Sequence, residues 1–316
     1  MKRPLKFAFV LVALLLVVLI LGAVLGSERL SLFNLTEQQR SILFDIRLPR
    51  VFLAACVGAS LAAAGAGLQA LLRNPLAEPY LLGVSNGAAL GTMLAFVFFE
   101  NIEFSRPVMA FLGAALATLV VYQMAKGRAG MTVERLVLSG VIATTFLSSV
   151  IVLLTSLLDA AKLRSFTFWL LGDLSQATRN GVYLSFGAAI VGTVLLASQA
   201  RALNLMMIGE RDALDFGVEV GRVRWLVFGA GAMLVGASVA ASGSVGYVGL
   251  VVPHLVRLAT GSDNRSVIPF AALAGATFVV LADTVARIAI APRELPVGAI
   301  TALIGAPVFI YLLRRS

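Results

Sequence analysis

The chain has 316 residues, of which 59% are hydrophobic and only 13% are charged, and its formal net charge is +9. The charged residues leave nine long stretches without Asp, Glu, Lys or Arg, which indicates a polytopic membrane protein and leaves no room for a soluble domain. The single cysteine, Cys56, excludes a disulfide framework. No basic run is interleaved with aromatic residues, so nucleic-acid binding is not expected.

Eight of the nine uncharged stretches have the length of one transmembrane helix. They cover residues 7–27, 51–72, 79–99, 107–125, 136–158, 180–200, 266–282 and 295–313. The ninth stretch, 225–256, is too long for one span, and the turn-forming cluster 242–246 divides it. The first stretch exceeds the apolar core of a secretory signal peptide and is interpreted as a span. The sequence therefore predicts an all-α polytopic membrane protein with ten transmembrane helices in a single permease domain, residues 1–316.

Basic residues gather at both ends of the chain. Lys2, Arg3 and Lys6 precede the first span, and Arg314 and Arg315 follow the last. Because cytoplasmic ends of spans collect Lys and Arg, both termini are expected inside, which requires an even number of spans. We therefore expect a multi-pass protein of the cytoplasmic (inner) membrane with both termini cytoplasmic.

Two segments between spans are expected outside the membrane on the opposite face. In the first, a short helix is predicted over 36–44, capped by Asn34 or Thr36. The second contains the aromatic and apolar run Phe166, Phe168, Trp169 and Leu170, which is typical of an interfacial segment lying on the membrane surface.

The longest cytoplasmic segment, 201–224, is predicted to form two short helices. One covers 202–208 and the other 210–216, and each is followed by a glycine, Gly209 and Gly217, at a position that favours a left-handed helix end. An ordinary solvated loop is the alternative, but it would leave several apolar side chains in water. These are Leu205, Met206, Met207 and Phe216. Docking to a separate protein would bury them.

Enzyme motifs are weak in this chain. Residues 83–87 match Gly-x-Ser-x-Gly around Ser85, but they lie in an apolar helical stretch without the strand that a nucleophile elbow needs. His254 is the only histidine, which excludes a two-histidine metal site. No lysine follows a glycine, so a P-loop is excluded. We expect a chain that is not an enzyme and binds no metal or cofactor itself; an intramembrane hydrolase built on Ser85 is the remaining enzymatic alternative.

Uphill transport would then need an ion gradient or a separate ATPase. For an ion-gradient-driven secondary transporter, Asp283 is the main residue that could carry a proton. It lies four residues before Arg287 on one helix face, so an ion pair that holds helices together is the simpler interpretation.

Small residues at helix-packing spacing recur in two of the spans. Gly58, Ala62 and Ala66 share one face of the second span, and the seventh contains Gly229, Gly231 and Gly236 around Met233. These residues are assigned to close helix packing.

Five strings in order along nearly the whole chain resemble the permease subunit of the iron-chelate and cobalamin ABC importers, often called type II importers. They are Arg47-Leu48-Pro49-Arg50; Arg73-Asn74-Pro75-Leu76-Ala77-Glu78-Pro79 leading into 82–87; Gly209-Glu210-Arg211-Asp212-Ala213 with Gly217; 246–254 with Arg257; and Glu294-Leu295-Pro296-Val297-Gly298 with Gly305-Ala306-Pro307.

The resemblance implies a homodimer of ten-helix subunits in the lipid bilayer, with the substrate path along the dimer axis. It also implies two ATP-binding cassette subunits inside, which hold ATP and Mg, and a substrate-binding protein outside. The cargo would be a bulky metal chelate such as a ferric siderophore, heme or cobalamin.

The resemblance assigns three groups of residues. Binding-protein docking falls on Arg47, Arg50 and Arg287, which would form an outward-facing rim. ATPase coupling falls on Leu205, Met206, Gly209, Glu210, Arg211, Asp212, Ala213, Phe216 and Gly217. A cytoplasmic gate falls on Asn74, Leu76, Thr132, Val133 and Glu134, although the second of these loops is bulkier and more charged than a small hydroxyl-bearing gate.

Overall fold

The computed structural model describes residues 2–26, 36–99, 102, 104–127 and 130–314, and this part of the chain is almost entirely helical. Seven helical units in it are long and apolar enough to cross a membrane. They are α1 (Lys2–Val24), the continuous unit α2 (Glu37–Ser41), η1 (Ile42–Arg47) and α3 (Leu48–Leu72), then α5 (Ser105–Ala125), α6 (Val133–Thr155), α8 (Arg179–Ser198), α11 (Val220–Ser242) and α13 (Asn264–Ile288).

Three shorter apolar helices complete the set of predicted spans. They are α4 (Val84–Phe98), α12 (Val248–Thr260) and α14 (Val297–Leu313). The other elements are η2 (Pro79–Leu82), α7 (Ala160–Leu170), α9 (Ala200–Ile208), α10 (Glu210–Asp215) and the two-residue antiparallel strands β1 (Lys126–Gly127) and β2 (Gly130–Met131). A helix therefore occupies each of the ten predicted stretches, and the predicted division of 225–256 is confirmed by the break between α11 and α12.

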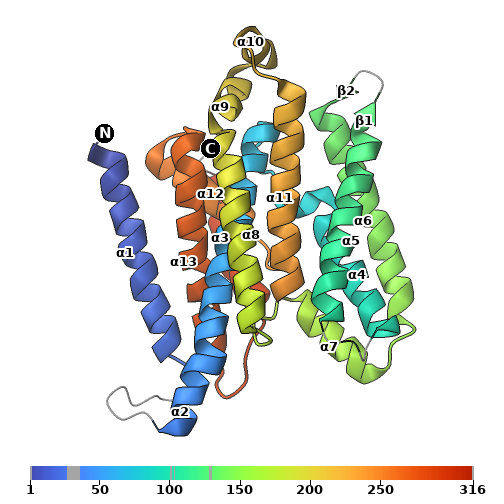
Figure 1. Ribbon diagram of the computed structural model, residues 1–316, viewed down its shortest axis with the longest axis vertical. Coiled ribbons are helices and arrows are strands. Elements are labelled where there is room, and N and C mark those ends of the chain that lie inside the picture. Colours follow the sequence, from blue (N-terminus) through green and yellow to red (C-terminus); the bar gives the residue numbers. More distant parts are fainter. Residues whose placement is uncertain (1, 27–35, 100–101, 103, 128–129, 315–316) are drawn as a thin grey trace.

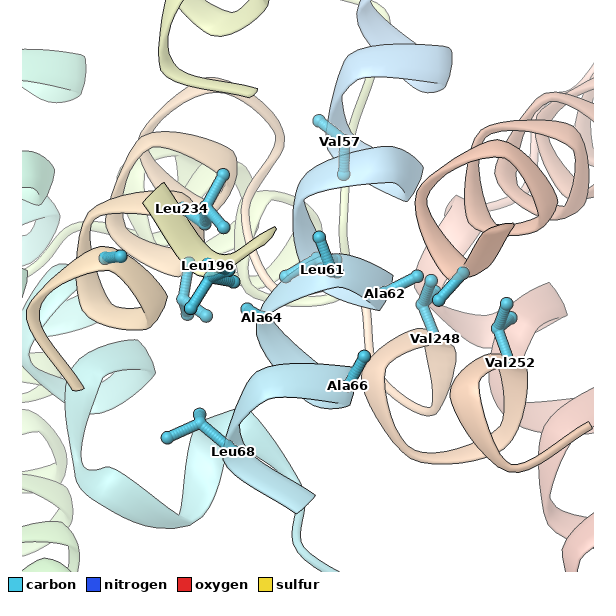
Figure 2. Close-up of a cluster of buried hydrophobic side chains, with 14 of the residues drawn as sticks. Val57, Leu61, Ala62, Ala64, Ala66, Leu68, Leu196, Leu234, Val248 and Val252 are labelled. Carbon is cyan, nitrogen blue, oxygen red and sulfur yellow. The ribbon is translucent and has the colours of Figure 1, made fainter. Parts of the chain in front are cut away.

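Helix α3 forms the centre of the bundle. It packs against α8, α11, α12 and α13. In the most apolar 18-residue stretch of the unit that contains α3, 83% of the residues are buried, compared with 22% in the corresponding stretches of α1, α6 and α8. Figure 2 shows Leu61 and Leu68 of α3 among Leu196 of α8, Leu234 of α11 and Val248 of α12. The peripheral helices keep their apolar side chains exposed, as expected for surfaces that face lipid.

Glycines let two helices approach the backbone of α3. A Cβ on Gly58 would lie 2.1 Å from the carbonyl oxygen of Gly275 in α13, and one on Gly65 would lie 1.9 Å from that of Gly249 in α12. The predicted packing role of Gly58 is thus confirmed. The same prediction was wrong for Gly229, which is exposed and has nothing within 4 Å of its Cβ position, because that face of α11 points away from its neighbours.

The two segments expected outside the membrane are both more tightly packed than predicted. Thr36 caps α2 with a reciprocal capping box, as predicted, but the helix then continues through η1 into α3 without ending; Asn34, the other predicted cap, lies outside the described residues. The interpretation of 166–170 as a surface segment was wrong for Phe166, which is buried between Phe96 and Trp169.

Functional elements gather at two opposite ends of the bundle. In Figure 1, α9, α10 and the β1–β2 hairpin lie at one end together with the markers of both chain termini, and α2 and α7 lie at the other. We call these the α10 end and the α7 end. The predicted docking residues are at the α7 end, and the predicted coupling and gate residues are at the α10 end.

Candidate docking and coupling sites

Three arginines and two carboxylates from η1, α3, α13 and the loop after α13 meet at the α7 end. Arg50 Nε lies 2.9 Å from Asp283 Oδ1, and Arg50 Nη1 lies 2.6 Å from Glu294 Oε2. Arg287 Nε lies 3.0 Å from Asp283 Oδ2, which forms the ion pair predicted from the four-residue spacing. The two atoms are not aligned for a hydrogen bond. Asp283 thus shares its single negative charge between two guanidinium groups.

Two of these arginines also close the end of α1. Arg47 Nη1 donates to the Val24 carbonyl at 2.7 Å, and Arg287 Nη2 donates to the Gly22 carbonyl at 2.9 Å. The last carbonyls of a helix have no partner within it and carry the negative end of the helix dipole, so cationic donors stabilise them.

The expectation of an outward-facing rim of arginines was wrong about their exposure to water. Arg47, Arg50 and Arg287 are only 5%, 6% and 3% exposed, because α1, Asp283 and Glu294 surround them. Their charges instead line a pocket of about 220 Å³ formed with Gly26, Ile42, Ile46 and Glu294. A second pocket of about 200 Å³, which also contains Asp173 and Pro296, shares Arg50 and Glu294 as a common wall.

At the α10 end, α9 and α10 form the predicted pair of short helices. The expectation that a separate protein buries Met206 was wrong: it is 1% exposed in this chain alone, and Ala213 is fully buried, since both face the core of the chain. The exposed apolar residues are instead Ile208 at 75%, Phe216 at 74% and Leu214 at 55%. The sequence analysis did not single out Ile208 or Leu214. Helical spacing puts these two residues away from Met206 and Ala213, but it identifies the exposed face only when the helices that pack against the other face are known.

The two glycines of this segment differ in conformation. Gly217 has φ +77°, the predicted left-handed helix end, and the Val218 N–H donates to the Ala213 carbonyl there. Gly209 has an extended backbone and serves as the junction between α9 and α10, so the prediction of a left-handed end was wrong at this position. The other predicted coupling residues Leu205, Arg211 and Asp212 lie on this segment, with Leu205 half-buried and the two charged residues exposed.

Two polar clusters attach this segment to the rest of the bundle. Glu210 pairs with Arg224 of α11 at 2.7 Å and with Arg73, the left-handed residue that ends α3, at 3.7 Å. Asn204 of α9 accepts hydrogen bonds at 2.8 and 2.9 Å from the side chain and backbone of Asn264, which is fully buried. These attachments join α9 and α10 to α3 and α13 at the α10 end of the bundle.

The second cluster extends to α12. Arg257 Nη2 donates at 3.0 Å both to Asn264 Oδ1 and to the Ala66 carbonyl of α3. Hydrogen bonds from Arg265 lower the pKa of the neighbouring Asp263 to about 2, and Asn204 adds another. Because the pKa of Asp263 is lower in the folded chain than in the unfolded chain, the ionised carboxylate stabilises the fold. This stabilisation is present above about pH 4 and is lost only as the pH falls toward 2.

The predicted gate residues lie at the same end on two separate turns. Asn74 Oδ1 accepts the Leu76 N–H at 2.9 Å, and the Leu76 side chain is 43% exposed. Thr132 caps α6 by accepting the Arg135 N–H, and Val133 and Glu134 form the first turn of that helix.

The residues singled out for other chemistry have structural partners. Ser85 Oγ lies 3.5 Å from Ser244 Oγ, where α4 begins beside the break between α11 and α12. Tyr80 fastens that break, since its hydroxyl bonds both the N–H and the carbonyl of Val245 at 3.0 Å. Among the described residues no group of three His, Cys, Asp or Glu side chains could hold a metal ion.

A bundle of apolar helices, seven of them long enough to cross a membrane in the part that the structure describes, is the architecture of a polytopic membrane protein. The chain belongs to the FecCD transport family, whose model matches residues 10–315.

Relatives of known name cover the chain from end to end. The vitamin B12 import system permease of Vibrio cholerae is 40% identical over 100% of this chain and 96% of that protein. The hemin transport system permease of Yersinia pestis is 38% identical over 96% of this chain and 94% of that protein. A solved inward-facing structure of a metal-chelate type ABC transporter superposes with a TM-score of 0.90 at 34% identity, covering 98% of this chain and 99% of that one. The predicted family is confirmed, and the alternative of an ion-gradient-driven secondary transporter was wrong.

Proposed function

We propose that this chain imports a bulky metal chelate, with cobalamin and heme as the first substrates to test and a ferric siderophore as the third. The observation that carries this proposal is the full-length similarity to permeases of vitamin B12 and hemin systems. Both of those ligands are large metal macrocycles, which suits a membrane body whose buried charges are concentrated at one end.

The proposed assembly is a homodimer with two ATP-binding cassette subunits on the cytoplasmic side and a substrate-binding protein on the other. ATP and Mg would be held by the cassette subunits, and this chain would hold no cofactor. All ten apolar helices would cross or enter the membrane, and both termini would be cytoplasmic, at the α10 end. The shared position of the terminus markers and α10 in Figure 1 supports this arrangement.

Each end of the bundle has a proposed partner. The pocket lined by Arg47, Arg50 and Arg287 would receive acidic side chains of the binding protein. The exposed side chains of Ile208, Leu214 and Phe216 would enter a cleft on the cassette subunit, since three large apolar groups in water favour burial at an interface. The turns at 74–76 and 132–134 would form the cytoplasmic gate.

The test is uptake into proteoliposomes that contain this chain and its co-expressed ATPase. Cobalamin, heme and a ferric siderophore are each offered with the matching binding protein, with ATP on the side of the cassette subunits. ATP-dependent accumulation of one ligand is expected, and a cassette variant that cannot hydrolyse ATP is the control. Accumulation of none of the three, with ATPase activity intact, would contradict the proposal. Ser85→Ala is expected to leave uptake unchanged, whereas a hydrolase would lose its activity.

A further inference from the structure

Arg50 binds two carboxylates that differ sharply in their exposure to water. The Asp283 side chain is 1% exposed, whereas that of Glu294 is 40% exposed. Asp283 could not leave its place without an unpaired charge remaining in apolar surroundings, which is strongly unfavourable. Glu294 can turn toward water because its own side chain is already partly hydrated, and Arg50 then keeps Asp283 as a partner. Of the two partners of Arg50, only Glu294 is exchangeable.

The space beside the Arg50–Glu294 pair suits a second carboxylate. The pair separates two pockets of about 220 and 200 Å³. Among the described residues that line the larger pocket, three are arginines and Glu294 is the one carboxylate. Asp283 lies against Arg50 and Arg287 and offsets their charge only in part, so an anion that enters this pocket meets a positive field.

The backbone around Glu294 is held in place, and on its N-terminal side the Arg293 N–H donates to the Ile290 carbonyl at 3.0 Å. The Leu295 N–H donates to the Ala286 carbonyl at 3.0 Å, and the Val297 N–H donates to the Gly172 carbonyl at 3.1 Å. Glu294 can therefore leave Arg50 by rotation of its side chain while the path of the chain into α14 is kept.

We infer that Glu294 is an internal substitute for an acidic side chain of the substrate-binding protein. It occupies Arg50 Nη1 while the partner is absent, and a partner carboxylate that enters the pocket lined by Arg47, Arg50 and Arg287 displaces it toward water. One carboxylate replaces another, so the buried guanidinium is never left unpaired. Glu294 competes with the partner and weakens docking, which speeds release of the emptied binding protein. This inference rests on the proposed function, since it requires docking at the α7 end.

The test measures the affinity of the binding protein that supports uptake for the intact transporter, including its ATPase subunits, in nanodiscs. Wild type is compared with Glu294→Gln and with the matched control Asp45→Asn. Asp45 is at the same end and carries the same charge, but it pairs with exposed Arg179 at 2.7 Å and lines neither pocket. We expect Glu294→Gln to bind about tenfold more tightly and Asp45→Asn to stay within about twofold of wild type.

Equal or weaker binding by Glu294→Gln would overturn the inference, and so would an equal gain for Asp45→Asn, which would indicate only a general charge effect. Glu294→Asp keeps the charge but shortens the side chain; it is also expected to bind more tightly, and it decides the matter if the Gln variant does not fold. If wild type itself does not bind the partner at ~50 mM salt, where charge attraction is weakly screened, docking at this end fails and the proposed partner with it.

Discussion

At the scale of single residues, Asp283 holds the α7 end together. It is fully buried and lies within 3.0 Å of nitrogen atoms on both Arg50 and Arg287. Arg287 in turn binds the end of α1. Such a pair contributes little net stability compared with apolar packing, but the removal of one partner leaves buried charge without compensation. The geometry therefore supports the ion-pair interpretation of Asp283 over that of a proton carrier.

We predict that Asp283→Asn destabilises the protein by about 3–5 kcal/mol, because two buried guanidinium groups lose their shared counter-charge. The measurement is the thermal unfolding midpoint of the purified chain in detergent. Asp45→Asn removes the same charge from a pair whose side chains are 55% and 64% exposed, and its effect should stay below about 1 kcal/mol. Equal midpoints for the two variants would contradict the role assigned to Asp283.

The sequence could predict only part of this cluster. The pair of Asp283 with Arg287 follows from four-residue spacing on one helix. The bond from Arg50 to Asp283 joins residues 233 positions apart, and no local pattern indicates it. The resemblance to a family placed the three arginines at one site, yet it did not show that the chain supplies their counter-charges itself. Long-range pairing depends on how α3 packs against α13, which is a property of the folded bundle.

At the scale of elements, α9 and α10 are attached on one face and bare on the other. Glu210 and Asn204 fasten the segment to α11, α3 and α13, and Met206 packs into the core. Ile208 and Phe216 point away from the chain with about three quarters of their surface exposed. A rigid element with an exposed apolar face can transmit displacement from a docked partner to the helices behind it.

We predict that Ile208→Asp abolishes co-purification of the ATPase subunit and reduces ATP-dependent uptake at least tenfold, since a buried interface position would gain an unpaired charge. The unfolding midpoint should be unchanged because the side chain makes few contacts within the chain. Ile290→Asp is the matched control: Ile290 is 56% exposed and follows α13 at the α7 end. Normal ATPase binding by Ile208→Asp would remove this surface from the coupling site.

The existence of both short helices could be predicted from glycine positions and apolar spacing. Which face is buried could not, because Met206 and Ile208 are equally apolar and only two residues apart. Their roles are decided by α3, α11 and α13, which pack against one side of α9. Gly229 also shows that burial depends on the neighbouring helices. A glycine at helix-packing spacing permits a close approach only where another helix lies beside it.

At the scale of the whole molecule, the α7 end and the α10 end have different chemistry. One end has buried ion pairs and two pockets, and the other has an exposed apolar helix pair and both terminus markers. Ten apolar stretches could be recognised from composition, and each is helical. The short lengths of α4, α12 and α14 could not be predicted from composition. Each of these helices begins late, because η2, the break between α11 and α12 and the loop at Gly172 meet inside the bundle.

We predict that the two ends face opposite sides of the membrane. The native Cys56 is buried, so a cysteine placed at position 208 or 290 gives a clean signal. With the chain expressed without its ATPase subunits, so that position 208 is uncovered, a membrane-impermeant maleimide should label Ile290→Cys in intact spheroplasts and Ile208→Cys only in inverted vesicles. Labelling of Ile208→Cys from outside would reverse the proposed topology and place the termini outside.

The manner in which α1 ends has a consequence for biosynthesis. Its terminal carbonyls are bonded partly by Arg47 and partly by Arg287, which comes 265 positions after Gly22. At about 5–20 residues per second, the ribosome needs roughly 13–50 s to add that many residues. The first helix to be inserted is therefore among the last to be locked, and it must wait at the edge of the growing bundle until α13 arrives. A nascent chain that stops before α13 leaves α1 without its main packing partner, held by Arg47 and by contacts with η1 and α3, and such a truncated product should be readily recognised by membrane quality control.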